Sequence, residues 1–90
     1  MNILMIEDNQ SVCEMMEMFF MKEEWKATFI QDGKEGLDAF LNDSGKWDLV
    51  ILDLNLPSLD GMQICREMRK VSKIIPIIML TAKDSESDQV

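Results

Sequence analysis

The sequence predicts an α/β fold in which a parallel sheet lies between layers of helices. Three observations support this class. Residues 2–6 (NILMI) and 47–53 (WDLVILD) are dominated by consecutive apolar residues, as in strands that are buried on both faces. The segments after these runs repeat apolar residues every three or four positions, the period of an amphipathic helix. Strands that alternate with helices form βαβ units with right-handed crossovers.

The first two strands and the helix between them occupy the N-terminal third of the chain. Residues 2–6 leave no room for polar alternation, and Asp8 or Asn9 can cap the helix that follows. The expected apolar face of this helix comprises Val12, Met15, Met16, Phe19 and Phe20. A second strand is expected at residues 26–31, where apolar and polar residues alternate as is typical of a sheet edge.

The remaining elements follow a turn at residues 32–33. A helix is expected at 34–42, with an apolar face made by Leu37, Phe40 and Leu41. After the strand at 47–53, a helix is expected at 61–71, with an apolar face made by Ile64, Cys65, Met68 and Val71. The last strand is expected at 74–81, and residues 85–88 form a capping box that begins another helix.

Strand composition also predicts the order of the strands in the sheet. The strands at 2–6, 47–53 and 74–81 are too apolar for an exposed face and should be central, whereas the strand at 26–31 belongs at the edge. This favours the order 2-1-3-4, numbered along the chain, with a topological switch between the first and third strands. Ligands bind outside the carboxyl ends of the strands at such a switch.

Composition excludes several classes of function. Nine basic and seventeen acidic residues give a formal charge of −8, which opposes binding of nucleic acid. The chain has no histidine, so Ser-His-Asp catalysis and histidine-ligated zinc are excluded. No apolar run is long enough to span a membrane, and two distant cysteines predict buried thiols in a reducing, cytoplasmic setting. The nine methionines are interpreted as core packing.

Three carboxylates are expected to meet at the switch. Glu7 and Asp8 follow the first strand, and Asp53 ends the third strand, its neighbour in the predicted order. Their mutual repulsion raises a carboxyl pKa or recruits a cation, and such an oxygen-only site suits Mg²⁺, with Mn²⁺ as the alternative. Thr81, at the end of the last strand, adds a hydroxyl. Carboxylates can form aspartyl-phosphates, and Asp53 is the best placed nucleophile.

Three motifs, ILMIEDN, VILDLNLPSLDG and PIIMLTAK, resemble in order and spacing the receiver domain of bacterial two-component response regulators. The closing TAKDSESD resembles the subfamily in which a winged-helix DNA-binding domain follows the receiver. The resemblance covers residues 1–90 and implies a flavodoxin-like three-layer sandwich that lacks its fifth strand and last helix. It also implies a phosphoryl group taken from a sensor histidine kinase, and control of transcription through an output domain absent from this chain.

The resemblance assigns the metal and acceptor roles to four residues. Asp53 is the implied phosphoacceptor, and Asp8 is the implied direct ligand of magnesium. Glu7 is implied to act on the metal largely through a water molecule, and Asn55 to contribute its backbone carbonyl. These roles come from the family pattern and not from the spacing of the residues.

The resemblance also concerns the C-terminal part of the chain. It implies that Thr81 is a switch hydroxyl and that the backbone amide of Ala82 contacts the phosphoryl group. The family's lysine on a fifth strand would lie beyond Val90, and Lys83 does not replace it, so phosphorylation is expected to be impaired. The strand at 74–81 then becomes an edge of interior composition, which predicts self-association through that edge.

Three rival functions are also weighed. A magnesium-dependent phosphatase with an aspartate nucleophile would carry a second acid two residues after Asp53, where this chain has Asn55, which cannot ionise. A flavin-binding module would have a phosphate loop rich in small residues, whereas Glu7 and Asp8 repel a bare phosphate. The third rival is a piece that folds only by self-association and does not signal. We therefore expect a signalling domain and not an enzyme with turnover.

Overall fold

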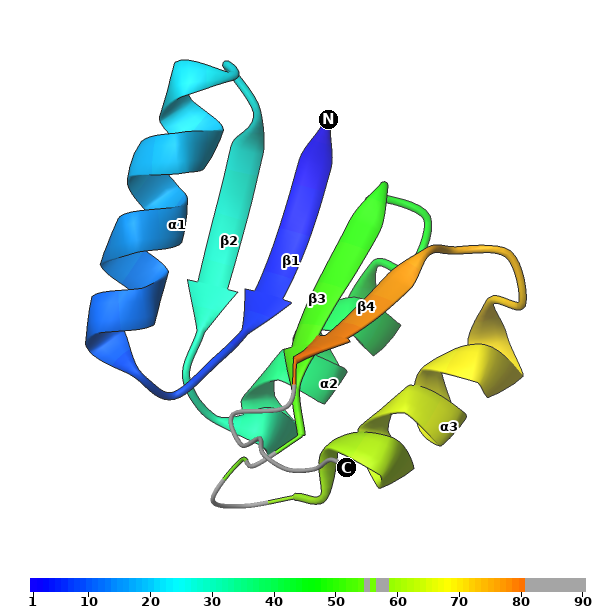
Figure 1. Cartoon of the computed structure of the whole chain (residues 1–90). Coiled ribbons are helices and arrows are strands. Elements are labelled where there is room, and N and C mark those ends of the chain that lie inside the picture. Colours follow the sequence, from blue (N-terminus) through cyan, green and yellow to red (C-terminus); the bar gives the residue numbers. More distant parts are fainter. Residues whose placement is uncertain (55, 57–58, 81–90) are drawn as a thin grey trace, which may run out of the picture.

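The computed structural model describes residues 1–54, 56 and 59–80, which form an α/β sandwich (Figure 1). The strands, all parallel, are β1 (Asn2–Ile6), β2 (Lys26–Ile30), β3 (Leu49–Asp53) and β4 (Ile77–Leu80). The helices are α1 (Gln10–Lys22), α2 (Gly33–Asn42) and α3 (Gly61–Val71). The sheet order is β2-β1-β3-β4, so the predicted fold class and strand order are confirmed.

Several boundaries differ from those expected. Strand β4 begins at Ile77, three residues later than predicted, because Pro76 has no N–H to donate and contributes only its carbonyl, which accepts from the Val50 N–H at 3.0 Å. Helix α2 begins at Gly33 within the expected turn, since the Asp32 carboxylate caps it by accepting from the Glu35 N–H at 3.0 Å. The capping box at 85–88 lies outside the described residues.

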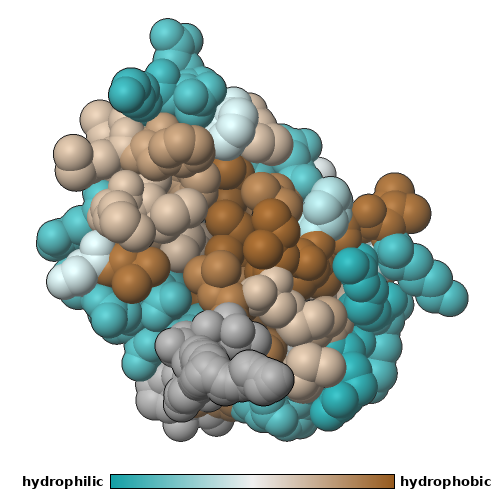
Figure 2. Space-filling model, in the orientation of Figure 1, coloured by the Kyte–Doolittle hydropathy of each residue, from teal (hydrophilic) through white to brown (hydrophobic). Residues whose placement is uncertain are grey.

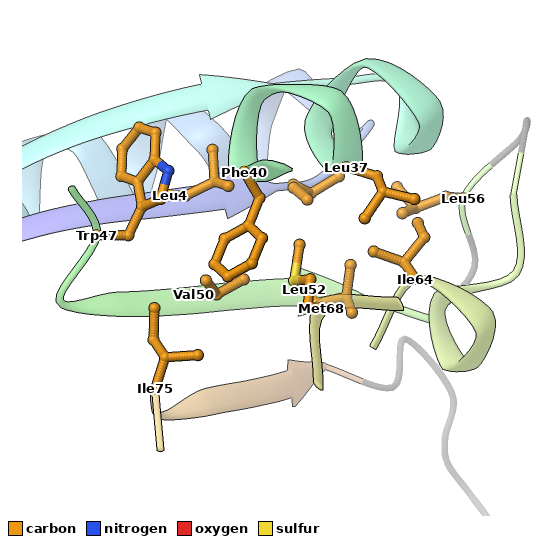
Figure 3. Close-up of a cluster of buried hydrophobic side chains, with 11 residues drawn as sticks. Leu4, Leu37, Phe40, Trp47, Val50, Leu52, Leu56, Ile64, Met68 and Ile75 are labelled. Carbon is orange, nitrogen blue, oxygen red and sulfur yellow. The ribbon is translucent and has the colours of Figure 1, made fainter. Parts of the chain in front are cut away.

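The larger apolar cluster fills the space between the sheet and helices α2 and α3 (Figure 3). Phe40 of α2 and Met68 of α3 are fully buried against Val50 and Leu52 of β3. The complete set of buried members is Leu4, Ile6, Leu37, Phe40, Trp47, Val50, Leu52, Leu56, Ile64, Met68 and Ile75. This cluster is the main core of the molecule.

Among the described residues, α1 is the helix that covers the opposite face of the sheet. Its buried cluster consists of Ile3, Met5, Phe20 and Ile51. Figure 2 views the molecule from this side and shows apolar side chains over the sheet between α1 and β4. Ile78 of β4 is half exposed there, and Leu80 is only partly buried. One helix therefore leaves part of this apolar face uncovered by the described residues.

The predicted apolar face of α1 is partly wrong. Val12, Met16 and Phe20 pack against the sheet as expected, but Met15 and Phe19 are more than half exposed. Cys13 takes a buried position on this helix. Six of the nine methionines are exposed (Met1, Met15, Met18, Met21, Met62 and Met79), so their interpretation as core packing is wrong for most of them.

Smaller corrections concern the other helices. Leu41 and Val71, expected on apolar faces, are exposed at the helix ends, and Cys65 is only partly buried. Leu41 is the last residue but one of α2, and Val71 is the last residue of α3. None of the helices within the described ranges is both long enough and apolar enough to cross a membrane.

Candidate metal centre

The backbone fixes two acidic segments side by side at the carboxyl ends of β1 and β3. Ile6 of β1 is paired with Leu52 of β3, so Glu7 and Asp53 are the next residues on adjacent strands. The Glu7 N–H donates to the Ile30 carbonyl at 3.0 Å, and the Leu54 N–H donates to the Leu80 carbonyl at 3.1 Å. Hydrogen bonds to both outer strands therefore hold this rim of the sheet.

Three carboxylates meet at this rim. Glu7, Asp8 and Asp53 each offer an oxygen atom, and these atoms all lie within 4.8 Å of one another. Glu7 and Asp53 are 6% and 4% exposed, whereas Asp8 is exposed to solvent. The arrangement expected from the strand order is present, with two acids held inside the structure and one at its surface.

The surroundings of the Glu7 carboxyl raise its pKa. Burial raises the pKa of its carboxyl to about 7, and a hydrogen bond with Asp53 and the charges of Asp53 and Asp8 add to this effect. The Asn9 N–H, which donates to Glu7 Oε2 at 3.1 Å, acts in the opposite direction. A divalent cation between the carboxylates would relieve the same repulsion, so proton and metal are expected to compete.

Asn9 connects the acidic segment to α1. Its side-chain Oδ1 accepts from the N–H groups of Ser11 at 2.9 Å and Val12 at 3.2 Å, and so caps the helix. The sequence left the choice of cap open between Asp8 and Asn9. Because Asn9 performs this role, the carboxylate of Asp8 is available to the rim.

Cys13 is a site neighbour that the sequence pattern did not reveal. Its Sγ donates to the backbone carbonyl of Glu7 at 3.4 Å from a buried position on α1. Burial, followed by the charges of Glu7 and Asp8, raises the pKa of this thiol, which keeps it protonated as a donor. Its position one turn into the helix that follows the acid pair is the only sequence signal for this contact.

Gly61 fixes the path of the chain that leaves Asp53. A Cβ at this position would lie 2.8 Å from the Asp53 carbonyl oxygen and 2.7 Å from the Leu54 Cα. Asp60 caps the same helix end by accepting from the Met62 N–H at 3.1 Å. The N-terminus of α3 is thus a point of close approach between this helix and the rim.

Three predicted site residues, Asn55, Thr81 and Ala82, lie outside the described residues, as does Pro57. The structure places Glu7, Asp8 and Asp53 together and leaves the others as predictions. Leu80, which precedes Thr81 in the sequence, is paired with Asp53 across β3 and β4.

The chemistry of the donor set fits a hard divalent cation. All three side chains offer oxygen, and the exposure of Asp8 leaves one side open to water. Mg²⁺ takes one or two carboxylates and keeps several waters, whereas zinc sites use thiolate or imidazole ligands, which this group lacks. The residues therefore suit Mg²⁺.

Comparison with known proteins gives a consistent result. Residues 3–90 match the family model described as the response regulator receiver domain. The chain is 61% identical over 90 residues to the uncharacterized transcriptional regulatory protein YclJ of Bacillus subtilis. The match covers 100% of this chain and 38% of YclJ, and a match to the response regulator ArlR of Staphylococcus epidermidis, at 42% identity, covers 99% of this chain and 39% of ArlR.

Solved structures give the same likeness. The response regulator protein TrrA of Thermotoga maritima, in a complex with Mg²⁺ and BeF, superposes with a TM-score of 0.82 and 34% identity, over 92% of this chain and 70% of that one. TrrA in a complex with the histidine kinase ThkA gives a TM-score of 0.81 and 34% identity, over 98% of this chain and 75% of that one.

Proposed function

The chain belongs to the family of response regulator receiver domains, and on that premise we propose that Asp53 accepts a phosphoryl group in two-component signalling. The observation that carries this proposal is the meeting of three carboxylates at the switch point of the sheet, with their oxygens within 4.8 Å of one another. Asp53 is the acid that ends the central strand β3, so its backbone is the most firmly held of the three.

We assign the metal site to Glu7, Asp8 and Asp53, with the backbone carbonyl of Asn55 as a further ligand. Mg²⁺, or Mn²⁺ in its place, supplies positive charge that offsets the carboxylates and the phosphoryl oxygens. The exposed Asp8 offers the direct ligand, and the buried Glu7 orients water at the metal. The Asn9 N–H holds the Glu7 carboxylate in place for this role.

The proposed step is a transfer between two proteins. A carboxylate oxygen of Asp53 forms a bond to phosphorus as the bond between phosphorus and a nitrogen of a phosphohistidine breaks, and the imidazole leaves with the electron pair. Thr81 is the proposed switch hydroxyl, and the backbone amide of Ala82 is the proposed donor to the phosphoryl oxygens. Because the transferred phosphoryl group becomes bound to Asp53 itself, we propose that the chain is a phosphoacceptor and not an enzyme with turnover.

The proposed donor is a sensor histidine kinase in the cytoplasm. TrrA, which this chain resembles, forms a complex with a histidine kinase, and YclJ is described as a transcriptional regulatory protein. We propose that this receiver likewise controls transcription, with DNA contacted by an output domain. The formal charge of −8 supports DNA binding by a separate output domain, because the receiver itself repels DNA.

We also propose that two copies associate through the β4 edge. In the described part of the chain, β4 is the last strand of the sheet on its side. Ile78 and Met79 on this strand are 50% and 39% exposed. A strand edge of this kind pairs readily with another, and an antiparallel pair of β4 strands would form a closed dimer.

Incubation with acetyl phosphate and Mg²⁺, followed by intact-mass measurement, tests the proposed acceptor. A gain of about 80 Da is expected for the wild-type chain and none for Asp53→Asn. Asp38→Asn, a matched change at an exposed position on α2, should leave the gain unchanged. Removal of Mg²⁺ by a chelator should abolish the gain.

Two results would contradict the proposal. One is an undiminished gain in Asp53→Asn, which would place the phosphoryl group elsewhere. The other is a gain that the chelator leaves unchanged, because the transfer would then not use the proposed metal site.

A further inference from the structure

Helix α3 carries a basic stripe on an otherwise acidic protein. Four of the nine basic residues of the chain lie on α3 or just beyond it, at Arg66, Arg69, Lys70 and Lys73. They surround a surface hollow of about 560 Å³, whose floor includes Met62 and Cys65. The hollow is therefore apolar near the N-terminus of α3 and basic near its C-terminus.

Helix α1 carries the complementary stripe. Glu14, Glu17, Met18 and Met21 follow the spacing i, i+3, i+4 and i+7, which places them on one face of the helix. All four are exposed, and the two methionines are 73% and 68% exposed. This face is acidic near the N-terminus of α1 and apolar near its C-terminus.

The surroundings of α1 extend the acidic region. Glu14 and Glu17 border a second hollow, of about 710 Å³, between α1, β2 and α2, which Glu35 also lines. The formal charge of −8 is thus distributed unevenly, with an acidic side at α1 and a basic side at α3. The two helices cover opposite faces of the sheet (Figure 1).

We propose that α1 of one copy docks antiparallel on α3 of a second copy of this chain. In that orientation the glutamates meet Arg66, Lys70 and Lys73, and the apolar halves of the two stripes meet over the hollow of α3. The helix dipoles favour the same orientation, because in an antiparallel pair the partly positive N-terminus of each helix lies beside the partly negative C-terminus of the other. A flexible methionine side chain is well suited to such a hollow.

The position of the two stripes fixes the type of assembly. Because the two stripes lie on opposite faces of the sheet, the contact joins two different surfaces. Every pair of copies therefore still has one free α1 stripe and one free α3 stripe. Such a heterologous contact adds further copies as concentration rises. Pairing of β4 edges, in contrast, stops at the dimer, so the two modes are distinguishable in solution.

Two basic residues are suitable for the test and two are not. Arg69 Nη1 donates to the carbonyls of Ile75 at 2.7 Å and Ser72 at 3.4 Å, so it fixes the end of α3. Lys70 forms an ion pair with Glu67 at 3.1 Å. Arg66 and Lys73 are exposed and can be changed without loss of these contacts.

The experiment is a charge exchange followed by sedimentation velocity. One variant carries Arg66→Glu and Lys73→Glu on α3, and the other carries Glu14→Lys and Glu17→Lys on α1. Each variant alone should associate at least about tenfold more weakly than wild type at low salt, because the α3 stripe of the first variant has no net charge and both stripes of the second variant are basic. An equimolar mixture should restore association, since the unaltered acidic stripe on α1 of the first variant then meets the unaltered basic stripe on α3 of the second.

Further readouts separate this contact from other forms of association. Association of the wild type should weaken at about 1 M salt, where the Debye length is about 3 Å. Ile78→Lys on β4 should leave the rescue in the mixture intact. Circular dichroism of each variant verifies that it is folded. Failure of the folded mixture to associate, wild-type association that is unaffected by salt, or wild-type growth that stops at a dimer would overturn the proposal.

Discussion

The two faces of the sheet are covered unequally, and the difference separates stability from function. On the face covered by α2 and α3, eleven residues form the buried cluster, and helices lie over both central strands. On the face covered by α1, the buried apolar cluster of the described residues has four members, and apolar side chains of β4 and α1 stay exposed. Since burial of apolar area is the dominant stabilising contribution, most of the stability should come from the first face.

The acidic rim lies on the face of the sheet that α1 covers. Successive residues of a strand point to opposite faces, and Asp53 lies in the same alternating series as Leu49 and Ile51 of the α1 face. Glu7 continues the series of Ile3 and Met5, and its carbonyl accepts from Cys13 of α1. The chemistry therefore lies where fewer apolar contacts hold the structure, while the opposite face maintains the fold.

The largest expected effect would break the better covered face. Phe40→Ala removes a fully buried ring between α2 and the sheet and should lower the free energy of unfolding by about 3–5 kcal/mol. Phe19→Ala, on α1, removes a ring that is 52% exposed and should cost about 1 kcal/mol. Urea denaturation followed by tryptophan fluorescence measures the free energy of unfolding of both variants. Equal losses would contradict the unequal contributions of the two faces to stability.

The next effect concerns the buried acid on the α1 side. With a pKa of about 7 in the folded state against an ordinary value of 4.5, Glu7 keeps a proton in the folded state between these two pH values and loses it on unfolding. Without metal, its contribution to stability is present below pH 4.5 and is lost as pH rises to about 7, by an amount on the order of 2–3 kcal/mol. Glu7→Gln should remove this dependence.

Magnesium should act in the opposite sense. It binds the ionised carboxylates, so its affinity for the wild-type chain should increase as pH rises through about 7, and binding should release a proton. Thermal midpoints with and without Mg²⁺ at two pH values test this expectation. A difference curve between wild type and Glu7→Gln that does not change with pH would contradict the assignment of the raised pKa to Glu7.

The smallest expected effect concerns the contact between α3 and the acidic rim. Gly61→Ala places a methyl group 2.8 Å from the Asp53 carbonyl oxygen, so the backbone must shift, at a cost of about 1–3 kcal/mol. Mg²⁺ affinity should decrease with it, because Asp53 moves. Gly45→Ala, which meets nothing within 4 Å, is the matched control and should change stability by less than about 0.5 kcal/mol.

Local patterns were sufficient to predict most of the fold. The uniform apolar runs identified β1 and β3 as central, and the polar alternation of residues 26–31 placed β2 at the edge, which gave the observed strand order. The same order predicted that Glu7, Asp8 and Asp53 would meet. The roles of Asn55, Thr81 and Ala82 stay predictions, since these residues lie outside the described part of the chain.

Other features of the site required the folded arrangement. A helical period shows which residues share a face, but it does not show which face is covered, and so the exposure of Met15 and Phe19 was missed. The contact of Cys13 with Glu7 depends on how α1 is seated against the strand end. The proximity of Gly61 to the Asp53 carbonyl depends on where α3 begins relative to β3.

The sequence by itself determined the order of the elements, the order of the strands and the three acids that meet at their ends, because hydrophobic period and strand connectivity are encoded locally. Only the tertiary structure decided that Glu7 has the strongly raised pKa, and that α1 and α3 present complementary stripes. Burial and surface complementarity depend on what lies next to a side chain in space, and a linear pattern does not contain that information.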